Sequence, residues 1–157
     1  MCSSDLSQDG RFLRQFLYDG FNVDERDRVV FDGIWSHIAG AARGSFNERF
    51  GMPAAGSVLL TPIRFPFTTD EQSFDGERGS LLQRYRPDQQ PKIVFSNTAV
   101  EYWGGGRAAA LIHASPDGRR DLPIPDNVRI YFLAGTQHEQ SVFPPRRARG
   151  QQADNPV

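Results

Sequence analysis

The chain has very little of what disulfide frameworks and thiolate metal sites are built from. Its 157 residues include one cysteine, Cys2, which excludes a disulfide framework and a cysteine-rich metal centre. The three histidines are scattered and show none of the spacings typical of metal ligands. We therefore expect no metal in this protein.

Long apolar runs and an excess of one charge are also missing. No apolar segment approaches the roughly 20 residues that a membrane-spanning helix needs. The formal net charge is -1, which gives no reason to expect nucleic acid or an anionic membrane as a partner. A composition of 38% hydrophobic and 24% charged residues suits one globular domain and argues against wholesale disorder. The cellular compartment stays open.

Both ends of the chain lack a core pattern. Residues 1–6 show no apolar alternation, and their Cys-Ser-Ser-Asp-Leu run is what a common sequencing adapter encodes in one reading frame. We expect an artefactual leader over 1–6, with native sequence from about Ser7. Residues 146–157 are expected to form a polar tail, so that the chain is a fragment cut at both ends. The alternative is a natural small protein with frayed termini.

Between these ends, helical and strand patterns alternate. The apolar periodicity predicts helices over 10–19, 80–86 and 107–114, and strands over 34–38, 92–96 and 128–134. Residues 29–42 fit a helix as well as a strand. Glycine and proline recur over about 45–91, which indicates an irregular insertion of the kind that often forms a lid or a substrate wall. Alternating strands and helices predict an α/β fold with a mostly parallel sheet.

Three polar residues stand at the ends of these elements. Ser7 precedes the first helix, Glu101 follows the strand at 92–96, and His138 follows the strand at 128–134. Serine, acid, histidine is the chain order of an α/β-hydrolase triad. A serine hydroxyl is a weak nucleophile until a base accepts its proton, and an acid must orient that base. We expect Ser7 to be the nucleophile, His138 the base and Glu101 the acid.

Each of these residues also has a simpler interpretation. Ser7 could be a helix N-cap, and Glu101 a favourable acid at a helix N-terminus. His138 could be a surface-loop histidine without a role. Asp121 and Asp126 are rival acids, although both lie in turn-like sequence beside prolines.

Several blocks, in the right order, resemble the α/β-hydrolase-domain family. They are SQDGRFLRQFLY at 7–18, FDG at 31–33, HIAGA at 37–41, RGSFN at 43–47, EYW at 101–103, and the segment from DLP at 121–123 to GTQH at 135–138. The resemblance covers almost all of 7–145 and implies the C-terminal part of a serine esterase-like domain, from the nucleophile elbow onwards. It implies a partial α/β-hydrolase fold: the elbow helix and the last three strands of a mostly parallel sheet, with an irregular insertion. It also implies that the oxyanion loop and earlier strands lie upstream of Ser7.

The elbow itself departs from the family's pattern. A sharp strand-to-helix turn should lift the hydroxyl of Ser7 above the sheet and make the backbone N–H of Gln8 an oxyanion donor. Small residues are expected on both sides of such a serine, but the chain has Asp5 and Asp9 there. Asp9 favours the alternative of a catalytically inactive, hydrolase-like binding domain. Truncation favours another alternative, an inert fragment.

The predicted activity is the hydrolysis of a small-molecule carboxylic ester through an acyl-enzyme, which requires no cofactor. His37, Tyr102 and Trp103 are candidate substrate-pocket residues. A satisfied core histidine is the default interpretation of His37, and packing explains Tyr102 and Trp103 as well as a pocket does. Half a parallel sheet would leave an apolar edge exposed. We therefore expect the isolated fragment to self-associate.

Overall fold

The computed structural model describes residues 2–46, 49–50, 65–103 and 108–138. The expected polar tail at 146–157 lies outside the described residues. So do residues 51–64 of the insertion and the first residue of the helix predicted over 107–114.

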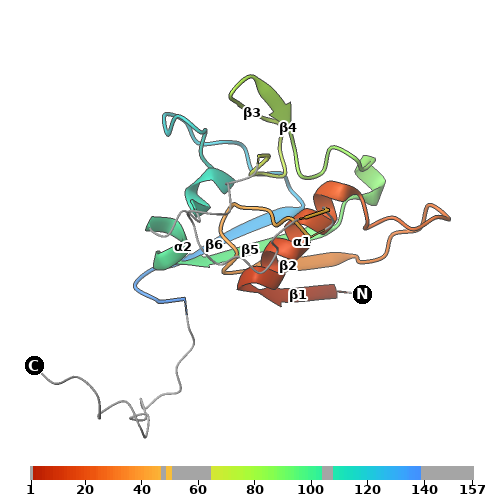
Figure 1. The fold of residues 1–157 in the computed structure, drawn as a ribbon, viewed down its shortest axis with the longest axis horizontal. Helices are drawn as coiled ribbons and strands as arrows, with labels where there is room; N and C mark the ends of the chain where they lie inside the picture. Colours follow the sequence, from red (N-terminus) through yellow and green to blue (C-terminus); the bar gives the residue numbers. More distant parts are fainter. Residues whose placement is uncertain (1, 47–48, 51–64, 104–107, 139–157) are drawn as a thin grey trace, which may run out of the picture.

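A parallel sheet of four strands forms the centre of the molecule (Figure 1). Each strand is parallel to its neighbour, and the long helix α1 (Ser7–Asp19) connects the first two. The predicted α/β class is therefore confirmed, and three strands follow the first helix, as expected. In spatial order the strands are β1 (Cys2–Leu6), β2 (Gly33–His37), β5 (Lys92–Thr98) and β6 (Val128–Leu133).

The expected leader contains the strand β1. Its backbone pairs with β2 along its whole length, from Cys2 opposite Gly33 to Leu6 opposite His37. A strand therefore leads directly into Ser7. β1 is defined by its backbone pairing and not by an alternation of apolar residues. Pairing with a distant strand leaves no local signal in the sequence.

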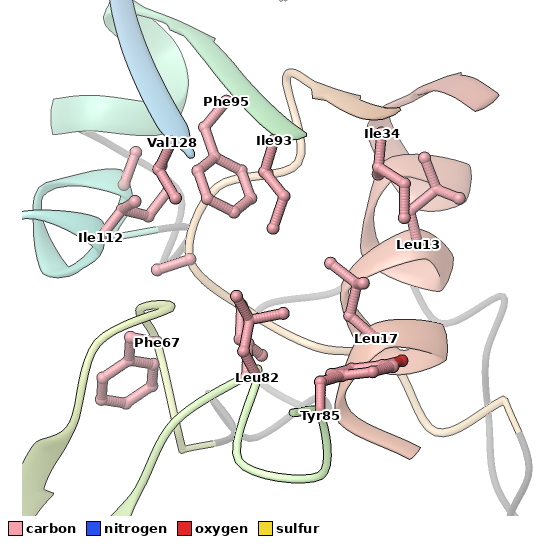
Figure 2. Packing of buried hydrophobic residues seen from close by; sticks show 13 residues of the cluster. Leu13, Leu17, Ile34, Phe67, Leu82, Tyr85, Ile93, Phe95, Ile112 and Val128 are labelled. Carbon is pink, nitrogen blue, oxygen red and sulfur yellow. The ribbon is translucent and has the colours of Figure 1, made fainter. Parts of the chain in front are cut away.

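The core lies on one face of the sheet, under α1 (Figure 2). Leu13 and Leu17 are one helical turn apart, so both point from α1 towards the sheet, where they meet Ile34 and Ile93. All four side chains are buried. Burying each one contributes roughly 1.5–3 kcal/mol relative to leaving it in water. Phe95 and Val128 extend the same apolar layer across β5 and β6.

The described part of the insertion also belongs to the core. Phe67, Leu81, Leu82 and Tyr85 are buried members of the cluster, and Figure 2 shows Tyr85 beside Leu17 of α1. The insertion further contains a hairpin, β3 (Gln72–Phe74) and β4 (Glu77–Gly79), where an irregular segment was expected. The two residues between these strands are an Asp-Gly pair with φ of 49° and 81°, as a tight two-residue hairpin turn requires.

The helix predicted over 80–86 is wrong: the segment forms successive turns, and its first residues bond to Thr68 and Thr69. The backbone N–H of Leu81 donates to Thr68, and the Ser80 hydroxyl donates to the carbonyl of Thr69 while accepting from the N–H of Leu82. Serine hydroxyls compete with helical hydrogen bonds in this way. A turn results, followed by the short 3-10 helix η1 (Pro87–Gln89).

The helix predicted over 107–114 is present only as the 3-10 helix η2 (Ala109–Ile112). It ends there because His113 and Ser115 pair with a later segment. The N–H of Leu122 donates to His113, and the N–H of Ser115 donates to Arg120. These contacts hold the chain extended where an alanine-rich sequence favours a helix. The short helix α2 (Ala99–Trp103) follows β5 directly.

The second face of the sheet is open among the described residues. Trp35, Tyr131 and Leu133 point to this side, and Trp35 is 47% exposed. They border a hollow of about 870 Å³. Parallel sheets are normally covered on both faces. This face is therefore unusually apolar for a surface that is exposed.

Candidate active site

Ser7 lies at the junction between β1 and α1 in a conformation that side chains rarely adopt. Its φ is 51°, in the left-handed region, which costs an L-residue roughly 1–2 kcal/mol. A sharp strand-to-helix turn of this kind raises the serine hydroxyl above the carboxyl edge of the sheet. Ile38, just beyond the end of β2, has a similar φ of 49°. Since Leu6 pairs with His37, the two left-handed residues follow neighbouring strand ends.

His138 meets Ser7 although the two are 131 residues apart. The Ser7 Oγ lies 2.9 Å from Nε2 of the imidazole. His138 comes from the loop after β6, on the far side of the sheet from β1. Figure 1 shows this loop and α2 at the same end of the sheet. Because all four strands are parallel, their carboxyl ends share this edge.

Glu101 completes the row from the other side of the imidazole. Its Oε1 lies 2.6 Å from Nδ1 of His138, and its side chain is fully buried. Glu101 belongs to the first turn of α2, immediately after β5. Its second oxygen, Oε2, accepts the backbone N–H of Thr98 at 2.8 Å and also the Thr98 hydroxyl.

The surroundings of Glu101 favour the charged carboxylate. Burial raises its pKa, but the hydrogen bonds from Thr98 and His138 outweigh that effect and leave the pKa below its ordinary value of 4.5. A carboxylate beside Nδ1 orients the imidazole with its proton on that nitrogen. Nε2 is then the acceptor that faces Ser7. The arrangement can withdraw a proton from the hydroxyl and hold the imidazolium that results.

The first turn of α1 supplies backbone donors beside Ser7. Gln8 stands in this turn, where helices present their N–H groups to an anion. Asp9, where a small residue was expected, has an exposed side chain. A small residue stands one position further on, at Gly10. Gly10 is buried, and its carbonyl accepts the Ser36 hydroxyl at 3.0 Å.

Three consecutive polar residues at the end of β5 were missed as part of the site. Ser96, Asn97 and Thr98 are all buried. The carbonyl of Ser96 accepts the N–H of Ile38 at 2.7 Å, and Oδ1 of Asn97 accepts the N–H of Gly40 at 2.9 Å. These bonds fix the loop that follows β2, next to the elbow. A run of polar residues ending an otherwise apolar strand is the signal that could have revealed them.

The comparison with protein families agrees with this architecture. The model of the alpha/beta hydrolase domain family matches residues 4–156. The chain belongs to this family. No curated protein and no solved structure gives a match. The family match includes the strand–turn–helix unit around Ser7 and all three residues of the hydrogen-bonded row in this α/β hydrolase domain.

The three candidate pocket residues border two hollows of the structure. His37 borders the hollow on the open face, where its Nδ1 lies 2.7 Å from the Ser96 hydroxyl. Tyr102 and Trp103 border a second hollow of about 360 Å³ beside η2 and β6. Among the described residues, neither hollow has Ser7 or His138 in its lining. A role for these residues in substrate binding stays a prediction.

The rival acids are not built into the row. Asp121 lies beside a different imidazole, with its Oδ1 3.9 Å from Nδ1 of His113, and its side chain is 93% exposed. Asp126 contributes its backbone carbonyl to Arg129. Within the described part of the chain, no cluster of three or more histidine, cysteine and acidic residues could hold a metal ion. No described helix is long and apolar enough to cross a membrane.

Proposed function

We propose that this α/β hydrolase domain is a serine esterase with Ser7, His138 and Glu101 as its catalytic triad. The observation that carries the proposal is the unbroken row of hydrogen bonds from the Ser7 hydroxyl, at 2.9 Å, to the imidazole and on, at 2.6 Å, to a buried carboxylate. The left-handed φ of Ser7 adds support, because strained conformations of non-glycine residues concentrate at functional sites.

The reaction would proceed in two halves. In the first, Oγ of Ser7 attacks the carbonyl carbon of the ester while Nε2 of His138 takes the hydroxyl proton. The backbone N–H of Gln8 donates to the oxyanion that forms. The tetrahedral intermediate then collapses: the bond to the leaving oxygen breaks, and His138 returns its proton to the departing alcohol. Ser7 is left as an acyl ester.

In the second half, water replaces the alcohol. His138 takes a proton from the water as its oxygen attacks the acyl carbon, and the second tetrahedral intermediate expels Ser7. The proton passes to Oγ of Ser7, and the carboxylic acid is released. Glu101 stays charged throughout and stabilises the imidazolium in both halves. None of these steps draws on a cofactor.

A fluorophosphonate probe tests the proposal, because it phosphonylates activated serines. We expect the chain to be labelled at Ser7, and to lose labelling in Ser7→Ala and His138→Ala. Ser73→Ala, on the exposed side of β3, is the matched control and should label like the wild type. Labelling should parallel the hydrolysis of a short-chain nitrophenyl ester. A folded chain that labels equally well with and without the Ser7 hydroxyl contradicts the proposal.

A non-catalytic binding domain is the competing function, and Asp9 is the feature that favours it. An anionic side chain two residues after the nucleophile is unfavourable for an oxyanion nearby. If the wild type is folded but unlabelled, Asp9→Gly separates the two functions. Labelling gained by this variant would show a triad suppressed by Asp9, whereas its absence would favour the binding domain.

A further inference from the structure

We infer that Thr98 is a positioning residue, which holds one oxygen of Glu101 so that the other faces His138. The inference rests on the proposed function, since the positioning matters for catalysis only if Glu101 is the triad acid. Thr98 is the last residue of β5 and is 4% exposed. Its backbone N–H and its hydroxyl both donate to the acid, so it would act through Glu101.

The two oxygens of Glu101 have separate partners. Oε2 accepts the backbone N–H of Thr98 and the Thr98 hydroxyl, while Oε1 faces Nδ1 of His138. A carboxylate at the end of a glutamate side chain can rotate about its last bond. Two donors from one residue oppose that rotation, because turning Oε1 away from the imidazole would break both of them. The orientation of His138 therefore depends on Thr98.

The local sequence explains why this contact forms. Thr98-Ala99-Val100-Glu101 has the Thr-x-x-Glu spacing of a capping box, in which the acid reaches back to the N–H of the residue that caps the helix. The backbone bond from Thr98 to Glu101 is that contact. In the usual box the hydroxyl accepts a helix N–H. Here it donates to the carboxylate instead. The acid of the proposed triad is thus also the residue that closes the first turn of α2.

The charge on Glu101 leads to the same assignment. Burial is the largest influence on its carboxyl pKa and raises it. The opposing hydrogen bonds from the Thr98 hydroxyl and the Thr98 N–H each lower the pKa more than the hydrogen bond from His138 does. Thr98 therefore contributes to keeping the carboxylate of Glu101 ionised, as the acid of a triad has to be when His138 accepts the serine proton.

Thr98→Val tests the inference, because valine keeps the shape and the backbone N–H and removes only the hydroxyl. We expect kcat for ester hydrolysis to fall about tenfold to a hundredfold, the rate equivalent of one hydrogen bond to a charged group. KM should stay within about twofold, because Thr98 would not touch the substrate. Thr98→Ser should recover most of the rate. Thr68→Val, a matched change at another buried threonine, should leave kcat unchanged.

A proton NMR readout separates this inference from the proposed function. The Nδ1 proton of His138, held by Glu101, should resonate far downfield in the wild type and be absent in His138→Ala. Thr98→Val should shift or broaden it, and Thr98→Ser should restore it. If Thr98→Val keeps both the wild-type kcat and the wild-type resonance while Ser7→Ala is inactive, the positioning role is wrong and the esterase stands. If the wild type is inactive, the proposed function fails, and the resonance alone decides whether Thr98 holds the acid.

Discussion

Replacing Glu101 by glutamine exchanges one carboxylate oxygen for an NH₂ group, and neither position in the structure accepts that exchange. With the amide nitrogen towards His138, it would face the Nδ1 proton, so the imidazole would have to move its proton to Nε2. Nε2 would then be unable to accept from Ser7 at 2.9 Å. With the amide nitrogen towards Thr98, it would face two donors. Either orientation removes one working contact.

The size of the effect follows from which contact is lost. The wrong imidazole tautomer disables the base, and a carboxylate-to-amide change at the acid of a Ser-His-Asp triad lowers kcat about 10⁴-fold. This corresponds to about 5 kcal/mol of transition-state stabilisation. The alternative orientation leaves His138 nearly intact and instead costs the fold about 2 kcal/mol, the net value of a hydrogen bond to a charged group. Since two donors from Thr98 oppose the second orientation, we expect the first.

The assay is ester hydrolysis by Glu101→Gln beside denaturant unfolding of the same sample. A loss of kcat by three to four orders of magnitude in a folded protein is the expected result, in line with a disabled base. A variant that keeps more than about a tenth of the wild-type kcat would refute the reasoning, because such a loss is smaller than the general base alone contributes. Glu101→Asp is the matched control for charge. It keeps the carboxylate but shortens its reach to His138, so its kcat should fall between those of the wild type and Glu101→Gln.

The stability of the wild type and of Glu101→Gln at low pH provides a second test. The pKa of Glu101 is lowered in the folded chain, so its ionisation stabilises the fold above the ordinary glutamate range. That contribution is lost as the pH falls through the lowered pKa, below the ordinary glutamate range. We expect the difference in free energy of unfolding between the wild type and Glu101→Gln to shrink over this range. A difference that is independent of pH would contradict the lowered pKa.

Three further predictions concern the fold. Leu17→Ala should lower the free energy of unfolding by about 2–5 kcal/mol, because Leu17 is 1% exposed. Leu133, at 41% exposed, is the control, and Leu133→Ala should cost about 0.5 kcal/mol. Equal losses in the two variants would contradict the core assignment. Tyr85→Phe removes the hydroxyl that accepts the N–H of Asn22, and should cost about 1–3 kcal/mol. Burial raises the Tyr85 pKa to about 12, so wild-type stability should fall more steeply above pH 10 than that of the phenylalanine variant, and parallel curves would refute this. The open sheet face and edge predict self-association in sedimentation experiments, which a monodisperse monomer would contradict.

The sequence predicts best the elements whose apolar pattern is strong. The helix at 10–19 and the strands at 34–38, 92–96 and 128–134 are present within a few residues, because each buries one face in a common core. The strand β1 was missed because pairing with β2 defines it. The turns at 80–86 and the shortened helix at 109–112 differ from prediction because hydrogen bonds to other segments, to Thr68 in the first case and to residues 120–122 in the second, limit how far each helical run extends.

For the candidate site, the order of the three residues along the chain predicts that they belong together, but the sequence does not predict the contacts between them. Serine, acid and histidine at the ends of successive elements suggested that they meet, since parallel strands end at one edge. Nothing in the sequence could give the 2.9 Å and 2.6 Å separations, which depend on the order of the strands in the sheet. The Thr-x-x-Glu spacing that places Thr98 against Glu101 is a weak signal here, because the helix that follows it has only five residues.

The left-handed backbone conformations of Ser7 and Ile38 lower the stability of the fold at the rim of the sheet where the proposed chemistry takes place. Glycine adopts positive φ without penalty, so it would relieve roughly 1–2 kcal/mol at either position. At 38 glycine would also forfeit the burial of the Ile38 side chain, which is 5% exposed and contributes roughly 1.5–3 kcal/mol. A library selected only for survival at high temperature should therefore drift towards glycine at 7 and keep isoleucine at 38. At 7 that gain would remove the hydroxyl itself. Engineers seeking a heat-resistant version of this domain should look for their improvements far from these two residues.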